Sequence, residues 1–128
     1  MGFFSKSQEE IFKNKFVDFY SIIASYSYGE LPASAGRRIE TDFFDLISEA
    51  RQFKDPFNET FKLYTKNTSI FGDKISIATG IAIARIAIDV VSQGRRLSNQ
   101  VQSMIIMQAK EMVSTYEGKQ TIRKLIYE

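Results

Sequence analysis

Three carboxylates come closest to catalytic chemistry in this sequence. Asp42, Asp45 and Glu49 are three and four positions apart, a spacing that places them along one face of a helix. Carboxylate oxygens are ligands that Mg²⁺ and Mn²⁺ accept, so a carboxylate-dependent metalloenzyme is one hypothesis. Such a site needs a second acidic pair on another helix, and we find none. We therefore expect a solvated acidic face, with Arg38 as a partner for Asp42.

The residue types that are missing exclude most other enzymes. The 128 residues include no Cys, His or Trp, which excludes thiol nucleophiles, Cys/His zinc sites, iron–sulfur clusters, imidazole catalysis and Ser-His-Asp triads. The sequence also lacks a phosphate-binding loop, since its one Gly-Lys pair, Gly118-Lys119, is followed by Gln120. We predict that the protein is not an enzyme and needs no cofactor.

Charge is distributed unevenly along the chain. Residues 1–60 contain seven basic and ten acidic residues, a net charge of −3, whereas residues 61–128 contain ten basic and five acidic residues, a net charge of +5. A basic C-terminal half can contact nucleic-acid phosphates. Nucleic-acid binding is therefore the alternative function, and it requires that the basic residues converge on one face. These residues are Arg95, Arg96, Lys110, Lys119, Arg123 and Lys124.

Aromatic and methionine side chains favour a protein partner. Tyr26 and Tyr28 lie near an expected bend, and a rigid ring with a polar tip suits an interface. The run 104–107 contains four consecutive apolar residues, which cannot all face one core, so self-association through this helix is a further expectation. We predict a non-catalytic protein-binding module, such as a stoichiometric inhibitor, an immunity or antitoxin-like protein, or an adaptor. The predicted partner-binding residues are Tyr26, Tyr28, Asp42, Asp45, Glu49, Arg95, Arg96 and Met107.

Helical periodicity covers the first half of the chain. Ser7 and Glu10 form a capping-box pattern ahead of a helix over residues 8–27. Gly29 to Pro32 breaks that helix, and Pro32 suits the first turn of a second one, whose apolar stripe runs to Phe53. A short third helix is expected after Asp55-Pro56, carrying Phe57, Phe61 and Tyr64 on one face.

The second half reads as further helices. Residues 75–91 are rich in Ile and Ala, and because alternation slips at Ala84 and Arg85 we favour a largely buried helix near residues 74–93, capped by Asp73, over a strand. Gly94 either ends or bends it, so residues 74–117 form a hairpin or one long helix. Ser98 is a possible cap. Gly118 is expected just past a helix end, before a terminal helix over 119–128.

The expected fold is an all-α, single-domain bundle of five or six helices over residues 1–128. Arg85 and Asp89 interrupt the most apolar stretch, so we predict no membrane span. The charged N-terminal residues do not resemble a secretion signal, and a cytoplasmic protein is expected.

Overall fold

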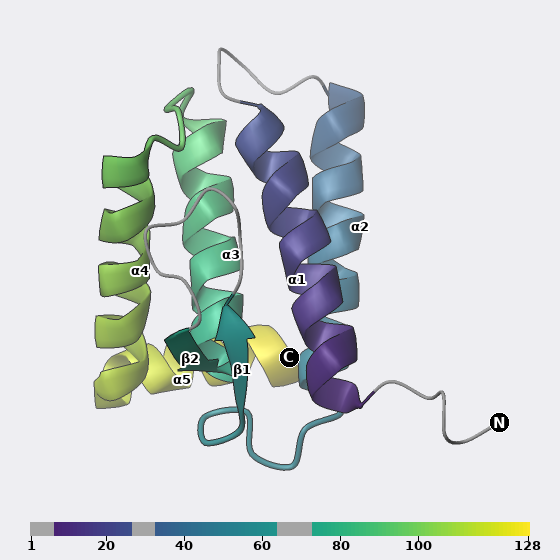
Figure 1. Ribbon diagram of the computed structural model, residues 1–128, viewed down its shortest axis with the longest axis vertical. Coiled ribbons are helices and arrows are strands. Elements are labelled where there is room, and N and C mark those ends of the chain that lie inside the picture. The colour runs from purple at the N-terminus through teal and green to yellow at the C-terminus, as the bar shows by residue number, and fades with distance from the viewer. Residues whose placement is uncertain (1–6, 27–32, 64–72) are drawn as a thin grey trace, which may run out of the picture.

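The computed structural model describes residues 7–26, 33–63 and 73–128. These residues form five helices and one two-stranded sheet (Figure 1), which confirms the all-α class. In chain order the elements are α1 (Gln8–Ser25), α2 (Ala33–Ala50), β1 (Thr60–Leu63), β2 (Asp73–Ser76), α3 (Ile77–Ser92), α4 (Asn99–Ser114) and α5 (Tyr116–Tyr127).

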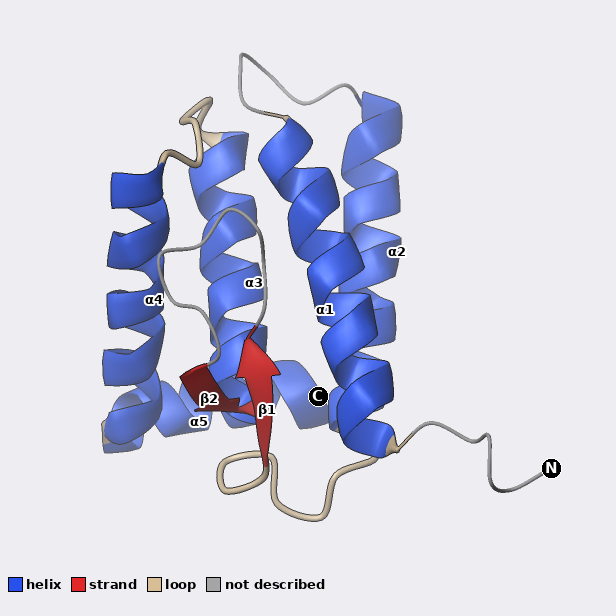
Figure 2. Ribbon diagram, in the orientation of Figure 1, coloured by secondary structure: helices blue, strands red, loops and turns tan. Residues whose placement is uncertain are grey.

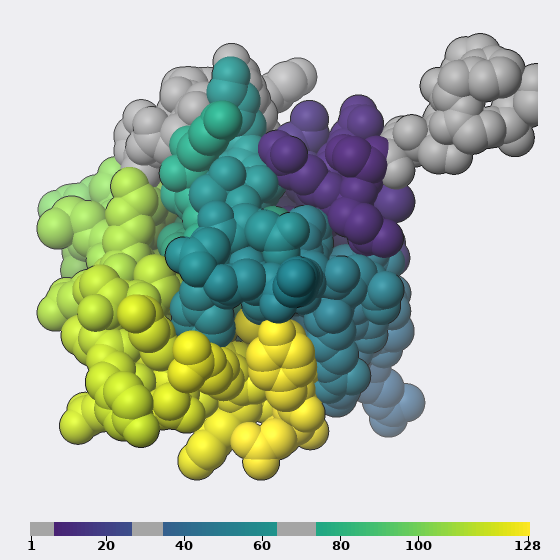
Figure 3. Space-filling view, turned by 90° about the horizontal axis from the view of Figure 1, so that it is seen from below, coloured from purple at the N-terminus to yellow at the C-terminus, as the bar shows by residue number. Residues whose placement is uncertain are grey.

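The four long helices form two antiparallel pairs. In Figure 1, α1 and α2 make one pair, α3 and α4 make the other, and α5 crosses their lower ends. Seen from below, α5 covers much of this end of the bundle (Figure 3). Arg51, just after α2, donates a hydrogen bond from Nε to the Ile126 carbonyl and so ties α2 to α5. The core lies between the two pairs and extends down to α5.

Both of the first two predicted helices are present, and α1 ends at Ser25, before the predicted end at residue 27. The predicted break at Gly29 to Pro32 lies outside the described residues. The Ser7 hydroxyl accepts a hydrogen bond from the Glu10 amide at 3.1 Å, which caps α1. Each helix then turns one apolar stripe inward, because apolar residues recur at helical spacing. The stripe of α1 is Phe12, Phe16, Phe19, Tyr20 and Ile23, and that of α2 is Ile39, Phe43, Leu46, Ile47 and Ala50.

The predicted third helix is wrong. Asp55 does start a turn, since its side chain accepts from the Phe57 amide, but the turn does not continue. Phe61 and Leu63 alternate with exposed residues in β1, and Phe61 pairs with Ile75 in an antiparallel hairpin shown in red in Figure 2. Burial of the Phe61 and Leu63 side chains against the core outweighs the local sequence pattern that favours a helix. Tyr64 lies outside the described residues.

The predicted Ile- and Ala-rich helix is largely buried, as expected, but it begins later. Residues 73–76 pair as β2, and Ser76 rather than Asp73 is the N-cap, accepting from the Thr79 amide at 3.0 Å. Ten of the sixteen residues of α3 are buried. On the solvent side Arg85 and Asp89 form an ion pair at 3.3 Å.

The chain from residue 74 to 117 forms a helical hairpin instead of one long helix. Gly94 has a φ of 76°, a left-handed conformation that glycine adopts without steric cost, and it helps to end α3. Ser98 caps α4 as predicted. The prediction for Gly118 is wrong: it lies in the first turn of α5, which Thr115 caps.

None of the helices within residues 7–26, 33–63 and 73–128 is both long and apolar enough to span a bilayer.

Candidate functional site

The seven predicted partner-binding residues that the structure describes do not form one site. Asp42, Asp45 and Glu49 share one side of α2, as expected. Tyr26 is half-buried at the end of α1 and packs against the core, and Tyr28 lies outside the described residues. Arg95, Arg96 and Met107 are exposed elsewhere: the two arginines lie in the loop between α3 and α4, and Met107 lies on α4.

A groove between α1 and α2 is where two of the predicted carboxylates gather. Its volume is about 250 Å³. The residues that line it are Lys15, Asp18, Phe19 and Ile22 from α1, and Arg38, Asp42 and Asp45 from α2. Phe19 is buried and Ile22 half-buried, so they form an apolar floor beneath charged walls.

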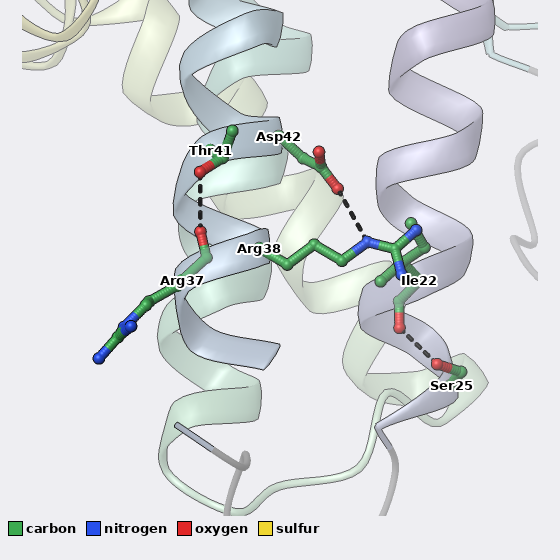
Figure 4. A network of polar contacts seen from close by, with 6 residues as sticks. All are labelled: Ile22, Ser25, Arg37, Arg38, Thr41 and Asp42. Carbon is green, nitrogen blue, oxygen red and sulfur yellow. Dashed lines mark hydrogen bonds and ion pairs between the residues drawn. The ribbon is translucent and has the colours of Figure 1, made fainter. Parts of the chain in front are cut away.

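Two ion pairs lie at the groove. Lys15 Nζ lies 3.0 Å from Glu49 Oε1 and joins α1 to α2. Arg38 Nε lies 3.8 Å from Asp42 Oδ2, which confirms the predicted pair. Figure 4 shows the Arg38 side chain reaching from α2 towards Ile22 of α1, and also the hydrogen bond that Thr41 donates to the Arg37 carbonyl. The carboxylates of Asp42 and Glu49 therefore each have a cationic partner within the chain.

Asp18 and Asp45 differ from Asp42 and Glu49 in their partners. They are exposed and line the groove from opposite helices. Within the described parts of the chain, neither carboxylate has an ion-pair or hydrogen-bond partner. The groove therefore presents two uncompensated negative charges above the apolar surface of Phe19 and Ile22, an arrangement that favours a cationic group carrying an aliphatic stem.

The three carboxylates on α2, Asp42, Asp45 and Glu49, do not form a metal centre. Across residues 7–26, 33–63 and 73–128, no three Asp or Glu side chains lie close enough to hold a metal ion. Asp42 and Glu49 face cations on Arg38 and Lys15. The metalloenzyme hypothesis has no assembled site among these residues.

The basic residues of the C-terminal half are separated. Arg95 and Arg96 precede α4, whereas Lys119, Arg123 and Lys124 belong to α5 at the other end of the bundle (Figure 1). The sixteen residues of α4 separate these groups by roughly 24 Å. Arg123 lies over the ring of Phe57, 5.0 Å from its centroid. Arg95 and Arg96 therefore form one basic group, and Lys119, Arg123 and Lys124 form another.

Sequence reasoning missed the α1 half of the groove. Lys15 and Asp18 lie on the polar side of α1, and no motif distinguishes them from other solvated charges. Only the pairing of α1 with α2 places Asp18 near Asp45. Tyr20, two residues after Asp18, belongs to the core, where burial raises the pKa of its phenol.

Breaking the Lys15–Glu49 pair is expected to change stability only slightly. Both side chains are partly exposed, so solvent screens the attraction. Glu49→Gln should lower the free energy of unfolding by less than about 1 kcal/mol in urea titrations. A loss of more than about 2 kcal/mol would show that this pair, rather than the apolar stripes, holds α1 against α2.

Comparison with known proteins adds no relationship to this geometry. Family models, curated proteins and solved structures were searched, and none matches this chain.

Proposed function

We propose that the protein is a non-catalytic protein-binding module whose α1–α2 groove receives a Lys or Arg side chain of its partner. The observation that supports this proposal is the pair of uncompensated carboxylates, Asp18 and Asp45, on opposite walls above Phe19 and Ile22. The aliphatic stem of a long basic side chain packs on the apolar floor, and its charged head lies between the two carboxylates.

The rest of the groove supports this role. The Lys15–Glu49 and Arg38–Asp42 pairs give the other two carboxylates of α2 a cationic partner within the chain. With Lys15 and Arg38 offset by Glu49 and Asp42, the charge left for a ligand is that of Asp18 and Asp45. An inhibitor, an immunity or antitoxin-like protein and an adaptor all bind in this stoichiometric way, and these remain the proposed classes.

Removing the two carboxylates is expected to weaken partner binding. The tagged chain is used to isolate its partner from native cells at moderate and at high salt, and the affinity of the purified pair is then measured by calorimetry. Asp18→Asn/Asp45→Asn should raise Kd at least about tenfold, since two charge-assisted contacts are lost. Higher salt should weaken the wild-type complex.

Glu40→Gln is the matched control. Glu40 is exposed on the side of α2 away from the groove, about half a turn from Asp42 and Asp45, and this variant removes one negative charge from the same helix. It should leave Kd within about twofold of wild type. If Asp18→Asn/Asp45→Asn binds the partner as tightly as Glu40→Gln does, the groove is not the binding site.

A further inference from the structure

The outer face of α4 is organised as a seam. α4 lies at the edge of the bundle, on the side away from α2 (Figure 1), and buries Gln102, Ile105, Ile106 and Ala109 on its inner face. Exposed residues on its outer face recur at alternating spacings of four and three, the heptad pattern by which one helix packs along another. They are Gln100, Met104, Met107, Glu111 and Ser114.

The centre of this seam is apolar and nearly free of charge. Met104 is 46% exposed and Met107 is 71% exposed. Among its sixteen residues, α4 contains only one basic and one acidic residue, Lys110 and Glu111. Protein interfaces are depleted of charge and enriched in methionine at their centres, and an exposed methionine pair is therefore suited to a partner helix of the same kind.

We propose that this seam binds α4 of a second copy of the chain, with the two helices antiparallel about a twofold axis. In the register centred between Met104 and Met107, Met104 of each copy lies against Met107 of the other. The same register places Gln100 against Glu111, so that an amide donates to a carboxylate at both ends of the apolar centre. A twofold interface repeats each of these contacts.

The charged residues beside the two ends of α4 favour antiparallel pairing. Arg95 is exposed in the loop before α4, and Tyr116, 77% exposed, and Glu117 follow its other end. Antiparallel pairing brings Arg95 of one copy to Tyr116 and Glu117 of the other, a cation beside a ring and a carboxylate. Parallel pairing would place Arg95 against Arg95 and Glu111 against Glu111. Two of the predicted partner-binding residues, Arg95 and Met107, then contact the same partner, the second copy of the chain.

The expected dimer is weak. A single helix pair buries less than the roughly 1,200 Å² at which standard stable interfaces begin. We therefore expect association in the micromolar range, and the measurements below use the full chain at high micromolar concentration.

Cysteine cross-linking tests the register. The chain has no native Cys, so Met104→Cys and Met107→Cys each introduce a single thiol on an exposed position. Mixing the two variants under mild oxidation should give a disulfide-linked heterodimer in clear excess over the homodimers that either variant forms alone, because residue 104 faces residue 107. Cross-linking of each variant with itself at equal yield would indicate parallel helices, and no cross-linking would show that the seam is free. Both of these results contradict the proposal.

Sedimentation equilibrium tests whether the α4 seam is the dimer interface. Met107→Glu places two unpaired carboxylates at the centre of the interface and should raise the dimer dissociation constant at least about tenfold. Phe44→Glu is the matched control, because Phe44 is 65% exposed on α2 and outside the seam, and it should leave the constant unchanged. A monomeric wild type, or equal effects of the two variants, would overturn the proposal. Thermal melts of both variants verify that each one is folded.

Discussion

Replacing Gly118 with alanine is expected to lower the free energy of unfolding by about 3 kcal/mol or more. A Cβ atom at this position would lie 1.9 Å from the carbonyl oxygen of Met112 and 2.8 Å from the Thr115 hydroxyl. The carbonyl belongs to the backbone of α4 and cannot move aside as a flexible side chain can. α5 would have to shift, and Ile122 and Ile126 would leave the core. Urea or guanidinium titration followed by circular dichroism measures the loss.

Gly36→Ala is the control with the opposite expected sign. Gly36 lies within α2, and nothing comes within 4 Å of a Cβ atom built there. Alanine should stabilise the protein by about 0.5 to 1 kcal/mol through its higher helix propensity. Helix propensity alone predicts the same gain at Gly118, so a Gly118→Ala protein as stable as Gly36→Ala would contradict the close approach of α5 to α4.

Phe61→Ala is expected to cost about 3 to 5 kcal/mol, a large part of the roughly 5 to 15 kcal/mol that stabilises a typical domain. Phe61 is fully buried, with ring centroids 5.0 Å from Phe12 and 5.5 Å from Phe16. It also covers Gly80 on α3, where a Cβ atom would lie 2.9 Å from its ring. The side chain therefore joins β1, α1 and α3, and its loss leaves a cavity among all three. The change is read from the denaturation midpoint.

Phe44→Ala is the control for Phe61→Ala, because it removes the same type of side chain from an exposed position. Phe44 is 65% exposed on α2, so removing its ring should change the free energy of unfolding by no more than about 0.5 kcal/mol. Similar losses for Phe44→Ala and Phe61→Ala would mean that the hairpin does not lie over the core as described.

The two proposed surfaces lie on different sides of the bundle. The groove is formed by α1 and α2, whereas the seam belongs to α4 at the far edge (Figure 1). A second copy on the seam therefore leaves the groove open, and a dimer would present two grooves to its partner. Binding to a divalent partner would then gain from effective concentration.

Local sequence patterns predicted much of the fold. Ser7 and Ser98 cap helices as expected, since a cap depends on residues only three positions apart. The apolar stripes of α1 and α2 and the burial of α3 also follow from periodicity. The Arg38–Asp42 pair at 3.8 Å follows in the same way, because helical neighbours four positions apart lie on one face.

The sequence alone determined an all-α chain with capped amphipathic helices, and its 128 residues include no Cys, His or Trp. The tertiary structure decided the rest. Three features depend on contacts between different elements. They are the pairing of residues 60–63 with 73–76, the close approach of Gly118 to Met112, and the groove that Asp18 and Asp45 line together. Local propensity carries no information about which helix lies beside which, because that choice minimises exposed apolar surface over the whole chain.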